Sequence, residues 1–360
     1  MDQHPLPDDA CTPVAVVDRD VLDRNIGAMA AAAAAQGLDL RPHAKTHKCL
    51  EVARRQCAAG AAGLTVATVS EAEVFADGGC TDLFLAYPVW ASPARAPRLR
   101  ALAARTTLRV GVDSAEGARA LAAAVGPAGV DVLVEVDSGH RRSGVAPAAA
   151  GEVGVAAARA GLQVAGVFTF PGHGYAPDRR AAAAADEARA LTQAAAALRA
   201  AGVGDGVRSG GSTPTAAFTD GRALTELRPG VYVYGDAQQV ELGACGWSDV
   251  AYWVAATVVS RADSHVVLDA GSKILGADRA AWATGFGRLP EYPDARMVAL
   301  SEHHGTVTFP PASARPGLGD VVRVVPNHVC AAVNLVDDLL VVAGGGVVDR
   351  WPVAARGANT

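Results

Sequence analysis

The chain has 360 residues, of which 50% are hydrophobic and 19% charged, a composition typical of a folded globular protein that can bury one large core or two smaller ones. The net charge of −5 gives no electrostatic basis for binding nucleic acid, and the apolar runs are too short for a membrane span, so we expect neither partner. The six cysteines show no disulfide framework and the first residues show no signal-peptide pattern, so we expect a cytoplasmic protein.

After an N-terminal arm at residues 1–12, short apolar runs alternate with alanine-rich helical segments as far as residue 240. The apolar runs predict eight strands, at residues 39–45, 63–67, 82–86, 107–112, 131–136, 163–169, 207–210 and 230–233. Alternating strands and helices form parallel sheets, and eight such units predict a closed (β/α)8 TIM-like barrel at residues 13–240. In that fold the loops that follow the carboxyl ends of the strands carry the active site.

Beyond residue 240 the pattern changes to short β-rich runs separated by Gly and Pro, with little helix. We interpret residues 241–360 as a C-terminal all-β domain. Its strands are predicted at residues 251–260, 265–270, 297–301, 306–309, 320–325, 331–336 and 339–342. The run Val14–Val17 can join this domain as an extra strand, because the barrel is complete without it.

The stretch Arg41–Lys48 reads Arg-Pro-His-Ala-Lys-Thr-His-Lys in a chain that uses arginine for nearly all of its positive charge. Lysine occurs at three positions only, Lys45, Lys48 and Lys273. Lysine is needed where an amine must lose its proton and attack a carbonyl group. On a strand, His43 and Lys45 would share one face. Like charge from His43, His47 and Arg41, together with desolvation, would lower the pKa of the amine. A basic loop without a catalytic role is the alternative interpretation.

Two glycine turns follow late strands of the predicted barrel. Gly210–Thr215 combines glycines with hydroxyl side chains, and Arg228–Tyr232 contains a second glycine turn. Backbone N–H groups and hydroxyls at a strand-to-helix turn suit an anion, and late barrel strands commonly hold a phosphate group. A simple helix cap after a glycine would give the first turn the same sequence.

Two further stretches carry candidate ligands. Asp137–Gly144 is either a polar loop or the source of an arginine that reaches a bound cofactor. His328 and Cys330 would share one face of a strand, where an imidazole and a thiolate favour Zn²⁺ and leave coordination positions open. The dipeptide His303–His304 can join the same neighbourhood. By spacing alone, a His-x-Cys pair is more often structural.

Taken together, these motifs resemble the group of D-threonine aldolase and eukaryotic-type D-serine dehydratase. The resemblance covers nearly the whole chain and is most specific at Arg41–Lys48 and at Pro326–Leu335. It implies an alanine-racemase-like fold, the cofactor pyridoxal 5'-phosphate (PLP) and a divalent metal ion. It departs from the group at His303, where an acidic residue often precedes the histidine that matches His304.

The resemblance also implies roles for individual residues. Lys45 would carry the cofactor and, together with Tyr175, act in catalysis, and Arg142 would lie near the pyridoxal oxygen. The residues expected to bind PLP are Lys45, His43, Arg142, Tyr175, Gly211, Ser212, Thr213, Gly230 and Tyr232. His328 and Cys330 would bind the metal ion.

The His-x-Cys pair resembles the dehydratases, whereas the aldolases of the group usually show His-x-Asp. We therefore expect a lyase that converts a β-hydroxy-D-amino acid such as D-serine into a 2-oxo acid and ammonia. Retro-aldol cleavage to glycine and an aldehyde stays open as the alternative, and a racemase or a non-catalytic PLP carrier is less consistent with the motifs. Related two-domain enzymes imply a homodimer.

Overall fold

The computed structural model describes residues 11–204 and 206–360, and these residues form two compact units. The barrel unit comprises Met29–Lys45, Ala53–Gly230 and Ala358–Thr360. The β unit comprises the described residues up to Ala28, together with Thr46–Val52 and Val231–Gly357. The predicted N-terminal arm lies almost wholly outside the described residues, and the domain boundary near residue 240 stays a prediction.

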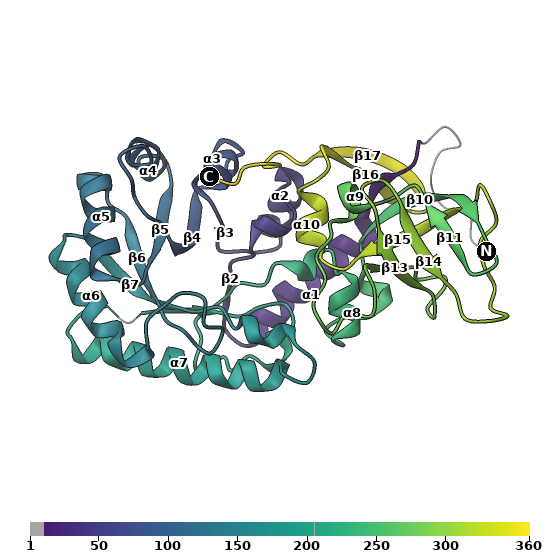
Figure 1. Cartoon of the computed structure of the whole chain (residues 1–360). Coiled ribbons are helices and arrows are strands. Elements are labelled where there is room, and N and C mark those ends of the chain that lie inside the picture. Colours follow the sequence, from purple (N-terminus) through teal and green to yellow (C-terminus); the bar gives the residue numbers. More distant parts are fainter. Residues whose placement is uncertain (1–10, 205) are drawn as a thin grey trace. The chain divides into compact units, whose positions relative to one another are not determined.

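The barrel unit is built on an eight-stranded sheet in which neighbouring strands run parallel (Figure 1). The strands are β2 (Asp39–Leu40), β3 (Leu64–Val66), β4 (Asp82–Pro88), β5 (Thr107–Val112), β6 (Asp131–Glu135), β7 (Gln163–Phe168), β8 (Val207–Gly210) and β9 (Glu226–Leu227). Their order in the sheet is β2-β9-β8-β7-β6-β5-β4-β3. The predicted TIM-like parallel barrel is confirmed.

The first and last strands in this order, β2 and β3, meet through backbone hydrogen bonds. Thr65 N–H donates to the Pro42 carbonyl at 2.8 Å, and His43 forms an isolated parallel bridge with Thr65. The predicted strand at residues 39–45 therefore ends early, because Pro42 has no N–H group to continue a ladder, and Ala44–Thr46 forms a 3-10 turn.

The strand predicted at residues 230–233 was wrong. The last barrel strand is β9 (Glu226–Leu227), and Val231–Val233 is a 3-10 turn. Pro229, which lacks an N–H donor, and Gly230 interrupt the chain between them. The consequence is that the second glycine turn follows β9 instead of lying inside a strand.

The helices of the barrel unit follow the strands in alternation, and Figure 1 shows several of them on the outer face of the sheet. They are α2 (Leu50–Ala58), α3 (Val69–Asp77), α4 (Ala96–Ala103), α5 (Ala115–Val125), α6 (Ala150–Arg159) and α7 (Arg180–Ala200), while α1 (Arg19–Ala35) and the start of α2 are shared with the β unit. Side-chain caps begin two of them: Thr68 accepts the Glu71 N–H and Ser114 the Gly117 N–H. None of the helices in the described residues has the length and apolar character that a membrane crossing requires.

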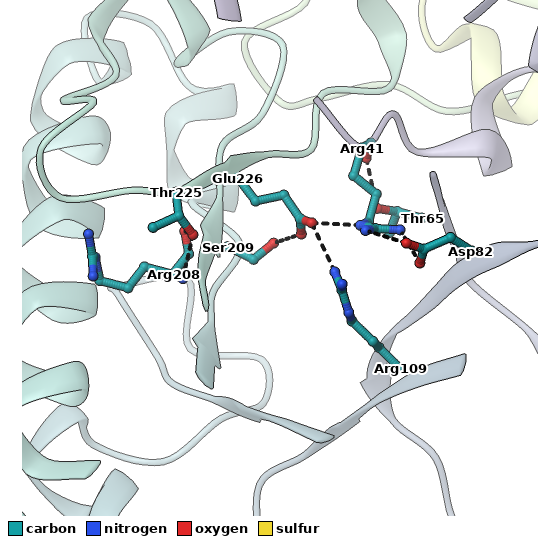
Figure 2. A network of polar contacts seen from close by, with 8 residues as sticks. All are labelled: Arg41, Thr65, Asp82, Arg109, Arg208, Ser209, Thr225 and Glu226. Atoms are coloured by element: carbon teal, nitrogen blue, oxygen red, sulfur yellow. Dashed lines mark hydrogen bonds and ion pairs between the residues drawn. The ribbon is translucent and has the colours of Figure 1, made fainter. Parts of the chain in front are cut away.

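The barrel interior combines an aromatic layer with a buried ionic network. Phe84 and Phe168 pack edge to face with ring centroids 5.0 Å apart, and the Arg228 guanidinium lies 5.5 and 5.4 Å from the two rings. Arg41 is paired with Glu226 and with Asp82, which enter from different strands (Figure 2). Arg41 follows β2, Glu226 lies on the neighbouring strand β9 and Asp82 begins β4, so the network joins three segments of the barrel.

The β unit contains a nine-stranded sheet with mostly antiparallel pairing. Its strands are β1 (Val14–Asp18), β10 (Tyr252–Arg261), β11 (His265–Leu268), β12 (Gly287–Arg288), β13 (Arg296–Leu300), β14 (Gly305–Thr308), β15 (Val321–Pro326), β16 (Asp338–Ala343) and β17 (Gly346–Pro352). Because β1 pairs with β10 and β16, the stretch from Val14 to Asp18 belongs to this sheet, which confirms the placement of Val14–Val17 as an extra strand of the β domain. The barrel boundary at residue 13 stays a prediction.

Three helices interrupt the β unit: α8 (Ala237–Glu241), α9 (Ser272–Leu275) and α10 (Val329–Val333). The strand predicted at residues 331–336 was wrong, since α10 occupies its first half and no strand follows before β16. The buried core of the unit joins side chains from β1, β10, β15, β16 and α8: Val16, Ala237, Trp253, Ala255, Val325, Leu340 and Val342.

Candidate active site

A cavity of about 460 Å³ opens among loops that follow strands of the barrel. This volume falls in the range typical of small-molecule and cofactor sites. Its lining brings together His43, Lys45, Ala67, Ala86, Tyr87, Pro88, Asp113, Arg142 and Ser143. Three of the predicted cofactor residues, His43, Lys45 and Arg142, therefore share one cavity. His43 and Lys45 meet there through the 3-10 turn and not through the strand alternation on which the prediction relied.

Phe170, which follows β7, links these groups to others. The Lys45 Nζ lies 5.7 Å from the centroid of its ring and the Arg142 Cζ lies 5.3 Å from it. The ring of Tyr175, in the 3-10 turn Gly172–Tyr175, is 6.0 Å away, and the ring of His140 meets Phe170 edge-on at 5.4 Å. The two cationic side chains and two further ring side chains are thus gathered around one aromatic ring.

The loop after β6 has a defined conformation that places Arg142 at the cavity. The Asp137 carboxylate accepts the N–H groups of Gly139, at 2.8 Å, and Arg141, at 3.0 Å. Partial burial raises the pKa of Asp137, but these backbone donors outweigh it and hold the pKa below its usual value. Gly144 has φ +93°, and a side chain there would collide with the backbone of Val136 and Asp137.

The two lysines of the motif occupy different environments. Lys45 lines the cavity of the barrel unit. Lys48 is buried in the β unit, where its Nζ donates to the Asn334 Oδ1 at 2.8 Å. Lys273 is exposed and pairs with Glu302. The geometry separates Lys45 from Lys48, its nearest rival as the cofactor lysine, which precedes α2.

Arg41, which was expected to act on Lys45 through its charge, lies in a buried ionic network. Its Nε lies 2.6 Å from the Glu226 Oε2 and its NH1 2.7 Å from the Asp82 Oδ1, and the guanidinium is buried in this network (Figure 2). The positive charge of Arg41 is therefore neutralised by two carboxylates. These contacts do not test the pKa of Lys45, and its expected lowering stays a prediction.

The glycine turns after β8 and β9 lie side by side, because Arg228 N–H donates to the Gly210 carbonyl at 2.7 Å. This pairing places the turn Gly211–Thr213 beside the segment that leads to Gly230. Neither turn lines the cavity that holds Lys45. Tyr232 is buried in the 3-10 turn Val231–Val233 and belongs to the β unit.

The backbone donors of the first turn have internal partners. Gly211 N–H donates to the Glu187 Oε1 at 2.6 Å, and Ser212 N–H donates to the Thr215 Oγ1 at 3.1 Å. Gly211 has φ +83°, a conformation that strongly favours glycine. The turn is therefore held in one shape by a buried carboxyl below it and a hydroxyl within it.

His328 and Cys330 are close, but not on a strand. His328 occupies the N-cap position of α10 without a capping hydrogen bond from its side chain, and Cys330 lies in the first turn of that helix. The negative charge that Cys330 carries when ionised raises the pKa of His328 well above its usual value; burial lowers this pKa, and a hydrogen bond donated to the Asp236 carboxylate raises it further. The His328 Nδ1 lies 3.5 Å from the Asp236 carboxylate, and the Cys330 Sγ donates to the Thr46 hydroxyl at 3.2 Å.

No group of three or more His, Cys, Asp or Glu side chains is arranged to hold a metal ion within the residues that the structure describes. His303 and His304 lie on an exposed turn between β13 and β14. The expectation that they join the neighbourhood of His328 and Cys330 is not supported by any such group.

Sequence reasoning missed Phe170, Glu187 and Asp236. Glu187 is the one acidic residue among the buried, mostly apolar positions of the alanine-rich helix α7, and this position in the helical pattern is the signal that could have identified it. Asp236 caps α8 by accepting the Gln239 N–H at 2.8 Å and also accepts the Val329 N–H at 3.2 Å. Its helix-cap position was readable from the sequence, but its contact with a segment more than 90 residues later was not.

Comparison with known proteins agrees with this architecture. Residues 17–238 match the family described as "Alanine racemase, N-terminal domain", and residues 251–342 match the "Putative serine dehydratase domain". The chain is 36% identical over 367 residues to the D-threo-3-hydroxyaspartate dehydratase of Delftia sp., covering 94% of this chain and 96% of that protein. It is 36% identical over 360 residues to the D-threonine aldolase of Arthrobacter sp., covering 96% and 93%.

Among solved structures, the D-threonine aldolase from Filomicrobium marinum matches with a TM-score of 0.91 and 35% identity, covering 99% of both chains. Fold, cavity and matched regions together define a PLP-dependent lyase of the alanine-racemase-like class. The chain belongs to the family that includes D-threonine aldolase and D-threo-3-hydroxyaspartate dehydratase, as the sequence motifs predicted.

Proposed function

We propose that Lys45 holds PLP in the cavity that it shares with His43 and Arg142. The support is the cavity volume of about 460 Å³ and the gathering of Lys45, Arg142 and Tyr175 around Phe170. A lysine amine can bond covalently to the aldehyde of the cofactor, and an arginine suits its phenolate oxygen. When bound, PLP supplies an electron-withdrawing ring that makes the Cα proton of an amino acid acidic.

The phosphate group of the cofactor is assigned to Gly211, Ser212, Thr213 and Gly230. The two turns follow adjacent strands, and the Ser212 hydroxyl lies in a buried turn that the Thr215 hydroxyl stabilises. Turns of this kind at the carboxyl ends of late barrel strands suit a phosphate. Tyr232 is proposed as a further contributor from the sequence resemblance alone.

We also propose that His328 and Cys330 bind one divalent metal ion, Zn²⁺ by preference. The observation that fits is the donor set: an imidazole and a thiolate in contact, with the His328 Nδ1 turned toward the Asp236 carboxylate. A carboxylate on one imidazole nitrogen fixes the tautomer that offers the other nitrogen to a metal ion. When bound, the metal ion would act as a Lewis acid that assists the departure of a hydroxyl group.

The proposed reaction is dehydration of a β-hydroxy-D-amino acid to a 2-oxo acid and ammonia. In this reaction Lys45 accepts the α-proton at Nζ, and Tyr175 and Arg142 orient the reacting groups. The single observation that carries the assignment is the contact between His328 and Cys330. Solved structures of the D-threo-3-hydroxyaspartate dehydratase include a histidine and a cysteine variant whose altered positions are two residues apart, and the cysteine variant is described as metal-free.

A second candidate is retro-aldol cleavage to glycine and an aldehyde. The observation that favours it is the similarity to D-threonine aldolases, which is as high as the similarity to the dehydratase. In that reaction a base removes the proton of the β-hydroxyl group and the Cα–Cβ bond breaks, while the cofactor site stays the same.

Product analysis separates the two candidates. Purified holoenzyme is incubated in turn with D-serine, D-threonine and 3-hydroxy-D-aspartate, and ammonia and glycine are assayed separately. We expect ammonia and a 2-oxo acid in equal amounts, without glycine. Release of glycine plus an aldehyde and no ammonia would replace the dehydratase assignment by the aldolase. A lack of any reaction with all three would refute both.

We further propose that the working form is a homodimer, as the sequence resemblance implies. Sedimentation of the active protein across its working concentration tests this proposal. A species of twice the chain mass of 36.5 kDa is expected, and an active monomer would contradict it.

A further inference from the structure

Glu187 is a buried carboxyl group that the proposed reaction does not use. It lies on α7, and its side chain is fully buried beneath the turn that follows β8. Its Oε1 accepts the Gly211 N–H at 2.6 Å, while its Oε2 has no hydrogen-bond partner among the described residues. A buried carboxyl with one unsatisfied oxygen is costly, so a fold that keeps it requires an explanation.

The turn above Glu187 is shaped around this carboxyl. A side chain at Gly210 would overlap the Glu187 Oε1, and a side chain at Gly211 would overlap the Leu227 side chain. Both glycines are therefore needed for the close approach between turn, helix and neighbouring strand. The hydrogen bond to Glu187 directs the Gly211 N–H toward the helix, so Gly211 fixes the shape of the turn through its backbone.

We propose that Glu187 is a positioning residue for the phosphate-binding turn, which it holds in place through the Gly211 N–H. When a phosphate group binds to the turn, Glu187 takes up a proton. This inference rests on the proposed role of Gly211, Ser212 and Thr213. It adds a residue on α7 that does not touch the cofactor and acts through the backbone of the turn.

Burial of Glu187 and the charge of an arriving phosphate group together explain why Glu187 takes up a proton. Burial raises the pKa of Glu187 to about 7, against smaller lowering effects from the Gly211 N–H and from Arg228. Arg228 is the charged side chain that acts on it, and its guanidinium donates to the Thr169 carbonyl. A phosphate group carries a charge of roughly −1.5 to −2 at neutral pH, and its arrival at the turn disfavours a second negative charge close by.

Because the phosphate and the proton favour each other, PLP affinity should fall as the pH rises above about 7, where the unliganded protein has lost the Glu187 proton. Below that pH, Glu187 is already protonated and contributes no dependence. Other titrating groups, including the phosphate itself, are common to all variants. The ratio of the Kd for PLP of the wild type to that of Glu187→Gln, followed across pH, therefore isolates the contribution of Glu187.

The experiment measures the Kd of the apoprotein for PLP, and for pyridoxal as a probe without phosphate, between pH 6 and 8.5. The variants are Glu187→Gln, which keeps an acceptor for the Gly211 N–H, and Glu187→Leu, which removes it. Glu241→Gln is the matched control, since this carboxylate also accepts a backbone N–H, that of Thr284, but lies in the β unit.

Glu187→Leu should weaken PLP binding about tenfold or more, as expected when a buried N–H loses its acceptor, and should change pyridoxal binding by less than about twofold. Glu187→Gln should bind PLP like the wild type at pH 6 and about tenfold more tightly at pH 8.5, with no such difference for pyridoxal. Glu241→Gln should follow the wild type throughout.

Parallel pH profiles for wild type and Glu187→Gln would overturn the proton uptake, and an unchanged ratio of PLP to pyridoxal affinity in Glu187→Leu would overturn the positioning role. Gly211→Val tells these failures apart from a wrong phosphate site. If Gly211→Val lowers PLP affinity and Glu187→Leu does not, only the role of Glu187 fails. If neither variant has an effect, the proposed phosphate site fails with it. If Glu187→Leu does not fold, the dependence of PLP affinity on pH in Glu187→Gln still tests the proposal.

Discussion

The Arg41 Nε lies 2.6 Å from the Glu226 Oε2 in the interior of the barrel, and both side chains are almost fully buried (Figure 2). The second oxygen of Glu226 accepts the Ser209 hydroxyl at 2.6 Å, and Asp82 binds the far side of the guanidinium. The pair connects β9 to the segment after β2, where the barrel closes. Arg41, two residues before the cavity residue His43, is thus anchored to β9 by a buried ion pair.

Removal of the charge at Glu226 should destabilise the protein. Glu226→Gln leaves the buried Arg41 with Asp82 as its ionic partner, and loss of one member of a buried pair costs about 3 kcal/mol in free energy of unfolding. Urea denaturation at neutral pH measures the difference. Glu73→Gln is the control, since Glu73 pairs with Arg98 at 2.6 Å with both side chains about one-third exposed, and it should cost less than about 1 kcal/mol. Equal costs for the two variants would contradict the buried network.

The same pair predicts how stability depends on pH. Burial raises the pKa of Glu226, but the charge of Arg41 outweighs it, so the pKa in the folded state is lowered. A carboxyl group of this kind stabilises the fold above its unfolded pKa of about 4.3 and loses that contribution as the pH falls through the folded pKa. The stability difference between wild type and Glu226→Gln should therefore be constant from pH 7 to about 5 and shrink below about 4. If the stability difference between the two proteins grew as the pH fell, the pKa of Glu226 would be raised in the folded state, and this account would be excluded.

The sequence predicted the middle of the barrel well, because buried parallel strands are continuous apolar runs. The strands at Thr107–Val112 and Val207–Gly210 have the predicted bounds. Errors occurred where a single residue changes the backbone. Pro42 ends β2 early, and His328 begins a helix instead of continuing β15.

The candidate site was predictable where residue type alone carries the chemistry. Scarcity of lysine pointed to Lys45, and the structure places it in a cavity with Arg142. The contacts of Glu187 with Gly211 and of Asp236 with His328 were not predictable, because they join segments separated in sequence by 24 and about 90 residues. Such pairs depend on the packing of helices against strands, which one sequence does not reveal.

Lys45 and Lys48 give a matched pair of variants for the cofactor. Lys45→Ala should abolish the visible absorbance of bound cofactor and the activity, because no amine remains in the cavity to bond to PLP. Lys48→Ala should keep both, since the Lys48 Nζ is bound to Asn334 in the β unit. Absorbance spectra before and after borohydride reduction provide the measurement. A covalent adduct that survives in Lys45→Ala and is lost in Lys48→Ala would reverse the assignment.

Alanine substitutions at two glycines with positive φ, Gly37 and Gly211, distinguish the effect of backbone strain from the effect of changing the shape of the phosphate turn. Gly37 has φ +65° and open space around it, so Gly37→Ala should cost about 1 kcal/mol in stability and leave PLP affinity unchanged. Gly211→Ala adds a collision with the Leu227 side chain to the same strain. We expect a larger loss of stability and a PLP affinity lowered by about tenfold or more, measured by titration of the apoprotein. If Gly211→Ala binds PLP as Gly37→Ala does, the phosphate lies elsewhere.

Metal removal tests the proposed role of His328 and Cys330. Purified protein should contain about one metal ion per chain by elemental analysis, and a chelator should remove it because two protein ligands leave coordination positions open. Chelation should leave the cofactor absorbance at Lys45 unchanged, since that bond does not involve the metal ion. Release of ammonia should fall by about three decades, because hydroxide is a poor leaving group and Lewis-acid assistance contributes several kcal/mol.

Variants of the cysteine extend this prediction to the choice between reactions. Cys330→Ser should lose most of the metal ion and the activity, whereas Cys11→Ser, which alters an exposed free cysteine, should lose neither. Cys330→Asp replaces a soft ligand by a hard one, so it should shift the preference from Zn²⁺ toward Mn²⁺ or Mg²⁺ and raise glycine release relative to ammonia release. Full ammonia release by chelated protein would disprove the metal assignment. Because the Lys45 cofactor site and the His328–Cys330 pair are assigned from separate contacts, that result would leave the PLP assignment intact.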